Sequence, residues 1–453
     1  MIVKNEAEIL GRCIESIKDA ADEIIVVDTG SIDNTVSVAK DSGAKVVVDE
    51  WKNDFSFARN ISIANASCEW ILWLDADDIV PPQSLPVINN LKKMNPGCVF
   101  GFIVRNEKPG NTGTEFIQAR MFPNRPDIFF ERRIHEQMMF SALRLGFKLV
   151  ETRAVVEHHG YADSQTMERK ARRNITLLLE EYSIHGADAV MAVEIADSYI
   201  ITGDIVNARK WYEKVLAIAD CESAFPQLAG QACLGLGNIF NREKKYADAT
   251  EQFKKALKLS PGRVDVMFSL AVSYDMLGLK NEAAGSLMEI IRGQQAPLFI
   301  GIDFREARIK SFLRLEKIFL ECNRISEALE IARQAVAELP LRPEIHNMAG
   351  RIFFKSGKLM DSLHAFEKSL QLDIPDNIEA YTGLCMIYAC AGKRETAINT
   401  IDSIKPVFKA VPAYWALFKQ FSETLPEDEI PATVNVADIE KKEEHIRRFF
   451  RLT

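Results

Sequence analysis

Glu69-Trp-Ile-Leu-Trp-Leu-Asp-Ala-Asp-Asp-Ile-Val-Pro-Pro82 joins a short apolar run to three carboxylates. Residues 70–74 are aromatic or branched and prolines follow closely, which is typical of a strand buried on both faces. A buried strand that ends in Asp-x-Asp places charge where open α/β sheets bind ligands. Asp75, Asp77 and Asp78 would repel one another unless a divalent cation or hydrogen-bond donors share the site. A plain acidic turn that caps the next helix is the alternative interpretation.

The first 90 residues alternate between strand and helix patterns. Strand patterns occur at 2–3, 23–28, 44–48 and 70–74, and helical patterns at 8–19, 33–42 and 57–66. This alternation implies βαβ units and a mostly parallel sheet in an α/β domain. Polar residues follow the strands at 4–6, 28–31 and 75–78, so we expect them to converge on one sheet edge. From 99 to 159, short extended runs broken by turn residues predict antiparallel additions and loops instead.

After Gly160 the sequence becomes helical and repetitive. A small residue begins the second helix of each unit, at Ala208, Ala249, Ala283, Ala328, Ser362 and Ala397. Three of these five intervals are 34 or 35 residues long, which is the spacing of tetratricopeptide repeats. The pattern predicts an α-solenoid, in which small residues let paired helices approach closely and stacked units bury faces that one unit cannot bury alone.

These patterns divide the chain into four predicted parts. They are an α/β domain at 1–162, a linking helix at 163–188, a repeat solenoid of about six units at 189–409 and capping helices at 410–453. The charged amphipathic segment 439–450 is interpreted as a polar-faced cap, with a partner-binding peptide as the alternative. Met1 to Val3 has the pattern of the end of a strand, so we expect this strand to begin upstream of Met1.

Composition narrows the classes of function and location. The 453 residues are 47% hydrophobic, 26% charged and carry a net charge of −8, so no general basic character predicts nucleic-acid binding. The eight cysteines show no CxxC pair and no metal-ligand spacing, which predicts free thiols in a reducing compartment. No stretch reaches the roughly 20 apolar residues of a membrane span, and charges at Lys4, Glu6 and Glu8 exclude a signal peptide. We therefore expect a cytoplasmic protein.

Six residues form the set that a sugar-nucleotide site would need. They are Asp28, Arg59, Asp75, Asp77, Glu136 and His158. A nucleoside diphosphate is polyanionic, and an acidic pair at a strand end can hold the divalent cation that neutralises it. Asp28 would form a hydrogen bond with the base or ribose of the nucleotide, or else cap a turn. Arg59 would pair with phosphate or with an aspartate, or else lie exposed on its helix.

Four motifs resemble family 2 glycosyltransferases, in the same order. They are Met-Ile-Val-Lys-Asn-Glu (1–6), Ile-Ile-Val-Val-Asp-Thr-Gly-Ser-Ile-Asp-Asn-Thr (24–35), Asn-Asp-Phe-Ser-Phe-Ala-Arg-Asn (53–60) and Trp-Ile-Leu-Trp-Leu-Asp-Ala-Asp-Asp (70–78). The resemblance covers about residues 1–160. Together with the repeats, the chain is similar to the bacterial peptide and protein glycosyltransferases typified by the sublancin S-glycosyltransferase.

The resemblance implies a GT-A fold with a Rossmann-like mixed sheet, an inverting mechanism, a nucleotide-sugar donor, above all a UDP-sugar, and Mg²⁺ or Mn²⁺. It places Asp28 at the nucleobase, Asp75 at the ribose or a metal-bound water, and Asp77 at the metal. The missing start of the first strand departs from the family pattern at the nucleobase pocket. The residues expected to bind the donor are Val3, Asn5, Glu6, Asp28, Gly30, Arg59, Asp75, Lys170 and Arg173.

Inversion by direct displacement needs a base that takes the acceptor proton. We predict Glu136 for this role, with Asp78 as its rival. A structural ion pair of Glu136 with Arg132 or Arg133 is the alternative. His135 would orient a carboxylate or phosphate, or be structural.

The end of the predicted catalytic domain supplies further candidates. His158 is expected at the metal rather than His159, because adjacent residues of a strand point to opposite sides. Lys170 and Arg173 would cover the diphosphate, or else belong to a solvated basic helix face.

The function predicted from the sequence is a metal-dependent glycosyltransferase that modifies a peptide or protein held in the repeat groove. We expect no nucleic-acid partner and no membrane span, and we leave a homodimer open. An inactive repeat scaffold is one alternative. A glycosyltransferase of cell-surface polysaccharide synthesis is another, although it predicts membrane segments or basic amphipathic anchors that the sequence lacks.

Overall fold

The computed structural model describes residues 1–390, except 109–111, 161–163, 187, 294–302 and 373–376. The chain divides into two compact units. The first spans Met1–Leu277 and Gly293–Ala307, and the second spans Gly278–Arg292 and continues from Arg308. The predicted Ala397 and the predicted capping helices at 410–453 lie outside the described residues.

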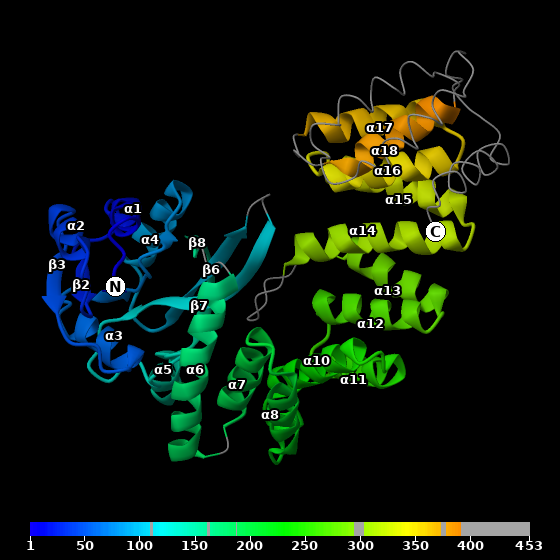
Figure 1. The fold of residues 1–453 in the computed structure, drawn as a ribbon. Helices are drawn as coiled ribbons and strands as arrows, with labels where there is room; N and C mark the ends of the chain where they lie inside the picture. The colour runs from blue at the N-terminus through cyan, green and yellow to red at the C-terminus, as the bar shows by residue number, and fades with distance from the viewer. Residues whose placement is uncertain (109–111, 161–163, 187, 294–302, 373–376, 391–453) are drawn as a thin grey trace. The chain divides into compact units, whose positions relative to one another are not determined.

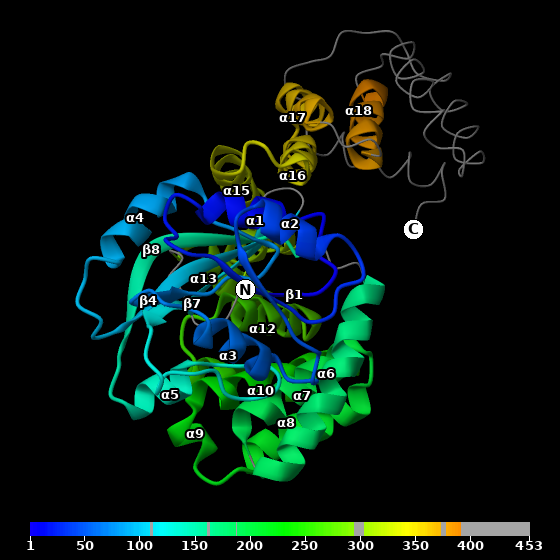
Figure 2. The same ribbon diagram turned by 90° about the vertical axis from the view of Figure 1, so that its left-hand side faces the viewer.

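The first sheet has three parallel strands in the order β1-β2-β3. Its elements are β1 (Ile2–Val3), α1 (Leu10–Ile17), β2 (Ile25–Asp28), α2 (Thr35–Asp41) and β3 (Lys45–Val48), followed by α3 (Phe55–Ala64). Figure 2 shows α1 and α2 on one side of β1 and α3 on the other. All four residues of β2 are buried, as expected for a strand covered on both faces. The predicted βαβ units are confirmed in this part of the chain.

The second sheet is mixed, with strands in the order β4-β7-β6-β8-β5. Its strands are β4 (Trp70–Leu72), β5 (Asp78–Ile79), β6 (Val99–Lys108), β7 (Thr112–Pro123) and β8 (Leu149–His158). The expected antiparallel additions after residue 99 are present, because β6 pairs antiparallel with β7. The strand with the acidic motif was expected in the parallel sheet, but β4 pairs antiparallel with the end of β7. The short helices η1 (Pro82–Ser84), α4 (Leu85–Leu91) and α5 (Met139–Arg144) connect these strands (Figure 1).

The strand β4 and its extension are buried on both faces, as the sequence predicted. Ile71 and Trp73 pack in one apolar cluster, which includes Phe122. Leu72 and Leu74 pack in another, built around aromatic residues of β6. Alternate side chains thus enter two cores, which fixes the register of the strand and the direction of the carboxylates that follow it.

The remaining described chain is helical. Its helices are α6 (Ser164–His185), α7 (Ala189–Ile201), α8 (Ile205–Ala217), α9 (Cys221–Ala224), α10 (Pro226–Arg242), α11 (Tyr246–Leu259), α12 (Val264–Met276), α13 (Lys280–Arg292), α14 (Phe304–Glu321), α15 (Ile325–Glu338), α16 (Pro343–Lys355), α17 (Leu359–Gln371) and α18 (Ile378–Cys390). The predicted small positions Ala208, Ala249, Ala283, Ala328 and Ser362 have no exposed surface. Close helix packing at these positions confirms the repeat pattern. None of the helices in the described part of the chain is both long and apolar enough to cross a membrane.

Gly237 of α10 lies against an aromatic ring, and this contact gives a test of the repeat packing. A Cβ added at Gly237 would lie 2.5 Å from Cε1 of Phe253, so we expect Gly237→Ala to destabilise the protein by about 1–3 kcal/mol, net of the better helix propensity of alanine. Gly285 of α13 is the matched control, because a Cβ there meets nothing within 4 Å. Gly285→Ala should stabilise by up to about 1 kcal/mol. Equal effects of the two substitutions in chemical denaturation would contradict the packing argument.

Candidate active site

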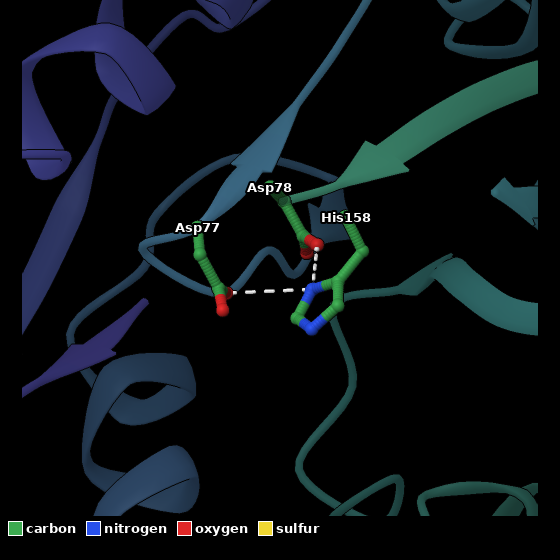
Figure 3. A group of neighbouring side chains, drawn as sticks. All are labelled: Asp77, Asp78 and His158. Carbon is green, nitrogen blue, oxygen red and sulfur yellow. Dashed lines mark hydrogen bonds and ion pairs between the residues drawn. The ribbon is translucent and has the colours of Figure 1, made fainter. Parts of the chain in front are cut away.

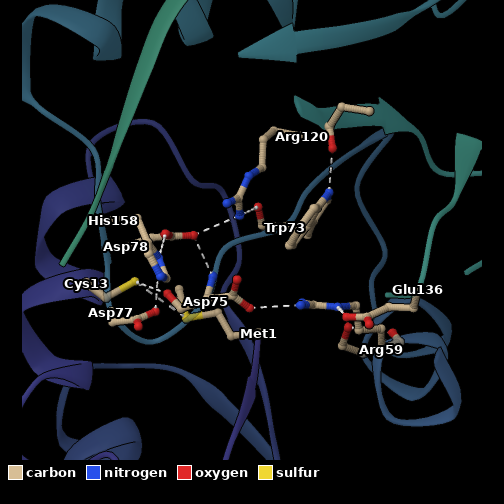
Figure 4. A network of polar contacts seen from close by, with 12 residues as sticks. Met1, Cys13, Arg59, Trp73, Asp75, Asp77, Asp78, Arg120, Glu136 and His158 are labelled. Atoms are coloured by element: carbon tan, nitrogen blue, oxygen red, sulfur yellow. Dashed lines mark hydrogen bonds and ion pairs between the residues drawn. The ribbon is translucent and has the colours of Figure 1, made fainter. Parts of the chain in front are cut away.

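The acidic turn after β4 is closed by Asp78. The backbone N–H of Asp75 donates to Oδ2 of Asp78 at 2.8 Å, and the backbone N–H of Asp78 donates to the carbonyl of Asp75 at 3.1 Å. Nη1 of Arg120 donates to the same Oδ2 at 2.8 Å. Asp78 has no exposed surface and Arg120 is only 2% exposed, so their charges neutralise each other in the interior (Figure 4). Asp78 was the alternative candidate for the catalytic base. Its complete burial keeps it from facing an acceptor, so Glu136 is the favoured candidate.

Trp73 joins the acidic turn to two arginines. The guanidinium carbons of Arg59 and Arg120 lie 4.3 and 4.0 Å from the centre of the indole ring. The indole Nε1 donates to the carbonyl of Ala119 at 2.8 Å, so the ring is fixed to β7. Cations over an aromatic face are attracted by its negative quadrupole. The ring therefore helps to hold two positive charges beside the acidic turn.

Arg59 bridges two of the predicted site carboxylates. It donates to Oδ1 of Asp75 at 2.8 Å and to Oε1 of Glu136 at 2.5 Å. Burial tends to raise the pKa of Asp75, but the charges of Arg59 and Arg120 outweigh it and lower this pKa to about 2. Arg59 is 6% exposed, so it is not the solvated helix arginine of the alternative interpretation. The ion pair of Glu136 is made with Arg59, whereas Arg132 and Arg133 pair with acids of other helices.

Asp77, Asp78 and His158 form a cluster that can hold a metal ion. Each offers one ligand atom, and these atoms lie within 4.8 Å of one another (Figure 3). Nδ1 of His158 lies 2.9 Å from Oδ1 of Asp78 and 3.4 Å from Oδ1 of Asp77. The antiparallel pairing of β5 with β8 sets Asp78 opposite His158, which explains how residues 80 positions apart meet. A carboxylate from Asp77 and the imidazole of His158, which Asp78 fixes, suit Mn²⁺, and Mg²⁺ with added oxygen ligands, so the residues fit the predicted cation.

The carboxylates of this cluster carry more negative charge than its imidazole can neutralise. Burial raises the pKa of Asp77, and the neighbouring carboxylates of Asp75 and Asp78 raise it further against the effect of His158. The hydrogen bond to Asp78 raises the pKa of His158. Both shifts mean that the region attracts positive charge, which is what a divalent cation would supply. His159 lies 3.8 Å from Glu157 instead, so the prediction of His158 over His159 agrees with the placement of the two rings.

Gly160 lies directly against the cluster. A Cβ at this position would be 2.8 Å from Nε2 of His158 and 3.4 Å from Oδ2 of Asp77. We therefore expect Gly160→Ala to weaken Mn²⁺ binding by about 10–100-fold, because the methyl group occupies space beside two ligands. Isothermal titration with Mn²⁺ measures this loss, and circular dichroism checks that the fold is retained. Gly97→Ala is the control, because a Cβ at Gly97 meets nothing within 4 Å.

The ends of β1 and β2 converge on the same edge as predicted. Oδ1 of Asp28 accepts hydrogen bonds from the N–H groups of Gly30 and Ser31, both at 3.0 Å, so Asp28 does cap a turn. Its Oδ2 is buried without a hydrogen-bond partner among the described residues, which leaves an acceptor for a ligand. Val3 pairs with Asp28 in the sheet, and Gly30 adopts a positive φ of 100° that suits glycine.

Asn5 and Glu6 continue this edge beyond β1. Oδ1 of Asn5 accepts from the N–H of Ile32 at 2.8 Å, which fixes the loop after β2. Burial raises the pKa of Glu6, and the nearby carboxylate of Asp77 raises it further. Glu6 is thus close to the metal cluster, as the predicted convergence of strand ends requires.

Lys170 and Arg173 lie on α6 and are both exposed. The charge of Lys170 lowers the pKa of Glu6 against the larger effect of burial. The guanidinium carbon of Arg173 lies 5.1 Å from the ring centre of Phe55, at the start of α3. Their predicted contacts with the diphosphate remain predictions.

Several residues around the site were not predicted from the sequence. The prolines at 123 and 126 favour a loop over residues 120–127, but β7 continues to Pro123 and Arg120 is buried. Residues 129–134 form no strand in the structure, and an isolated bridge joins Glu131 to Gln137. Strict alternation along β7 could not have placed Arg120, because the register of β7 against β6 shifts at this residue: Met121 pairs with Phe100 and Ala119 pairs with Gly101. No pattern in the sequence predicted the buried environment of Glu194 in α7, because that environment depends on packing against the loop 131–137.

Glu194 makes the stability of the protein depend on pH. Burial raises its pKa to about 8, with Asp188, Asp197 and Glu136 adding to the shift and Arg132 opposing it. Native Glu194 keeps its proton to higher pH than the unfolded chain, whose glutamate titrates near 4.5. Its contribution to the unfolding free energy is therefore present below pH 4.5 and is lost as pH rises through 8. We expect Glu194→Gln to reduce the loss of stability between pH 5 and pH 8 by about 2 kcal/mol, measured by urea denaturation at both pH values. An unchanged pH dependence would contradict the assignment.

Comparison with known proteins identifies two families along the chain. The family described as "Glycosyl transferase family 2" matches residues 1–152. The family described as "Tetratricopeptide repeat" matches residues 230–263. The first match covers the first sheet and the second sheet apart from most of β8, so it includes Asp77 and Asp78 but not His158, and the second match covers α11 with most of α10.

Three curated relatives are similar to parts of this chain. A TPR repeat-containing protein of Synechococcus elongatus is 34% identical over 223 residues, which are 48% of this chain and 55% of that protein. The SPbeta prophage-derived glycosyltransferase SunS of Bacillus subtilis is 33% identical over 184 residues, 40% of this chain and 43% of SunS. An uncharacterized glycosyltransferase of Rickettsia felis is 44% identical over 80 residues, 17% of this chain and 27% of that protein. The chain thus spans about half or less of the length of these relatives.

Proposed function

We propose that this chain, in which a family 2 glycosyltransferase domain at the N-terminus precedes tetratricopeptide repeats, transfers a sugar from a nucleotide-sugar donor to a peptide or protein acceptor. The observation that carries the proposal is the cluster of Asp77, Asp78 and His158, and the charges of both Asp77 and Lys170 act on the neighbouring Glu6. This edge combines ligands for a cation with a basic side chain. A nucleoside diphosphate needs both.

The donor would bind along the strand ends. The free Oδ2 of Asp28 is an acceptor for an N–H of a base or an O–H of a ribose, and a UDP-sugar is the donor that we favour. Asp77 and His158 would hold Mg²⁺ or Mn²⁺, with Asp78 fixing the imidazole. When bound, such a cation stabilises the negative charge of the diphosphate leaving group. Lys170 and Arg173 would add positive charge on the same side.

Glu136 is the proposed base for an inverting displacement. Its carboxylate would remove the proton of the acceptor while the acceptor atom attacks the anomeric carbon opposite the departing diphosphate. The bond between that carbon and the diphosphate breaks as the new bond forms. Arg59 orients Glu136 through the 2.5 Å contact and Asp75 through the 2.8 Å contact, so it ties the base to the acidic turn.

The repeats supply the argument for a polypeptide acceptor. Stacked helical repeats form extended concave surfaces that suit extended peptides. Two of the relatives are named as a glycosyltransferase and as a repeat-containing protein, which supports the pairing of catalysis with repeats. The cytoplasmic location predicted from the sequence belongs to this proposal.

The test uses the full chain with Mn²⁺ and a panel of UDP-sugars. We expect release of UDP from at least one donor, and a mass increase of one sugar residue on a co-expressed acceptor peptide. Intact-mass spectrometry measures the mass increase. Fragmentation of the modified peptide then shows whether oxygen, sulfur or nitrogen carries the sugar. Binding of peptides without any release of UDP would instead support an inactive repeat scaffold.

A further inference from the structure

We propose that α7 belongs to the catalytic unit, because its residues Asp188 and Glu194 are positioning residues for Glu136. They act through the loop Glu131–Gln137, which carries Glu136. The inference rests on the proposed role of Glu136, and it assigns to the start of the repeat region a task other than acceptor binding.

One side of the loop is fixed to α3. The N–H of Phe55 donates to the carbonyl of Arg133 at 2.8 Å. Asn60 exchanges two hydrogen bonds with the backbone of Phe130, at 2.8 and 2.9 Å. These bonds place the loop beside Arg59, but they contact its beginning and not the residues next to Glu136.

The other side of the loop is fixed by the helices. Nη2 of Arg132 donates to Asp188 at 2.7 Å, and Nη1 of Arg133 donates to Glu180 at 2.9 Å. Ile134 is 4% exposed and packs in the apolar core of α6, α7, α8 and α10. Nδ1 of His135 lies 3.8 Å from Oε1 of Glu194. Four consecutive side chains therefore contact helices before the fifth, Glu136, contacts Arg59.

The loop backbone needs these contacts. Arg132 and His135 have φ values of 75° and 51°, in the left-handed region that disfavours residues with a Cβ. Such conformations persist only where the surroundings hold them, and they occur often at functional sites. Without the helix contacts we expect the two residues to relax, which would turn Glu136 away from Arg59.

The charges on α7 complement the loop. Arg132 is 15% exposed at its side chain and Asp188 is 30% exposed, so their pair is partly shielded from water. Asp188 also caps α7, because its side chain accepts from the N–H of Met191 at 2.9 Å. One residue thus ties the first turn of the helix to the loop. Oε2 of Glu194 and Nη1 of Arg132 are both buried without a hydrogen-bond partner among the described residues, so each retains hydrogen-bonding capacity beside the loop.

Four variants of the full chain test the proposal. Asp188→Asn keeps an oxygen for the helix cap but removes the charge that Arg132 needs. Glu194→Gln removes the second acid, and Arg132→Met removes the cation while Arg132→Lys restores it. Glu222→Gln is the control, because its pair with Lys255 involves no residue of the loop and is exposed, at 49% and 40% of the two side chains. We measure amide hydrogen exchange of residues 131–137, and kcat and donor KM with Mn²⁺ and UDP-sugar.

We expect Asp188→Asn and Arg132→Met to speed exchange of the loop and to lower kcat by about tenfold, because a small displacement of Glu136 costs rate. Donor KM should change less than about twofold, since the donor contacts are elsewhere. Glu194→Gln should also speed exchange of the loop and lower kcat, but by less than Asp188→Asn does. Arg132→Lys should recover part of kcat, and Glu222→Gln should leave both measurements unchanged. In a Glu136→Gln background, Asp188→Asn should lower kcat no further, whereas a general structural loss would add to it.

Loop exchange that stays at the wild-type rate in Asp188→Asn and Arg132→Met would overturn the proposal, whether or not transfer is detected. Faster exchange supports the restraint of the loop by α7 on its own. Faster exchange in a chain whose wild type transfers no sugar would count against the proposed function and not against the restraint. Equal losses of kcat in the wild-type and Glu136→Gln backgrounds would overturn the positioning role.

Discussion

Asp77→Ala is expected to lower donor turnover by about 10³-fold while the protein stays folded. Asp77 is a ligand candidate whose Oδ1 lies 3.4 Å from His158, and its loss leaves the cation with one of its two proposed ligands. The diphosphate would then leave without full charge stabilisation, which is the largest electrostatic contribution in such a reaction. Release of UDP from a UDP-sugar with Mn²⁺ measures the effect.

Asp41→Ala is the control for this substitution. Asp41 is an exposed aspartate at the end of α2, so its removal should leave turnover unchanged. Thermal unfolding of both variants shows whether the fold is intact. Donor turnover of Asp77→Ala at the wild-type rate would remove Asp77 from the metal site.

Arg120→Met is expected to lower the unfolding free energy by about 3–5 kcal/mol, the cost of leaving a buried charge without its partner. Asp78 is completely buried and accepts from Arg120 at 2.8 Å, so the substitution leaves its carboxylate without its principal counter-charge. The substitution also removes the cation that lies over Trp73. Urea denaturation followed by circular dichroism measures the loss.

The exposed pair of Arg125 and Asp127 provides the control. Its Nη2–Oδ2 distance is 2.7 Å, close to that of the buried pair, but its side chains are 50% and 41% exposed. Arg125→Met should therefore have no measurable effect on stability. The double variant Arg120→Met/Asp78→Asn should be more stable than Arg120→Met alone, because the stranded charge is gone. If the two arginine variants unfolded at the same urea concentration, burial would not govern the strength of this pair.

Local patterns were sufficient to predict much of the fold. The run Trp70–Leu74 is buried on both faces because alternate side chains enter two cores, and a short apolar run already indicates this. The small residues of the repeats are buried because helix pairs approach closely there, and their spacing is visible along the chain. Polar residues after β1 and β2 lie at one sheet edge because each follows a strand end, whereas the carboxylates after β4 belong to the second sheet.

The contacts that organise the site depend on register, which the sequence does not display. Asp78 meets His158 because β5 pairs with β8 at that position, and a slip of one residue would bring His159 there instead. Arg120 reaches Asp78 because β7 pairs with β4, although its neighbouring prolines suggested a loop. The partner of Glu136 was expected among adjacent arginines, but left-handed residues at Arg132 and His135 direct the neighbouring side chains to the helices.

The close approach of Gly160 to the metal ligands makes this position a point at which metal preference can be redesigned. A side chain added there would begin 2.8 Å from Nε2 of His158 and 3.4 Å from Oδ2 of Asp77, within reach of an ion held by both. Gly160→Cys would bring a soft sulfur to a site of hard oxygens and shift the selectivity from Mg²⁺ and Mn²⁺ towards Zn²⁺. In the proposed site, the absence of a side chain at residue 160 leaves an ion with the carboxylate and imidazole ligands alone.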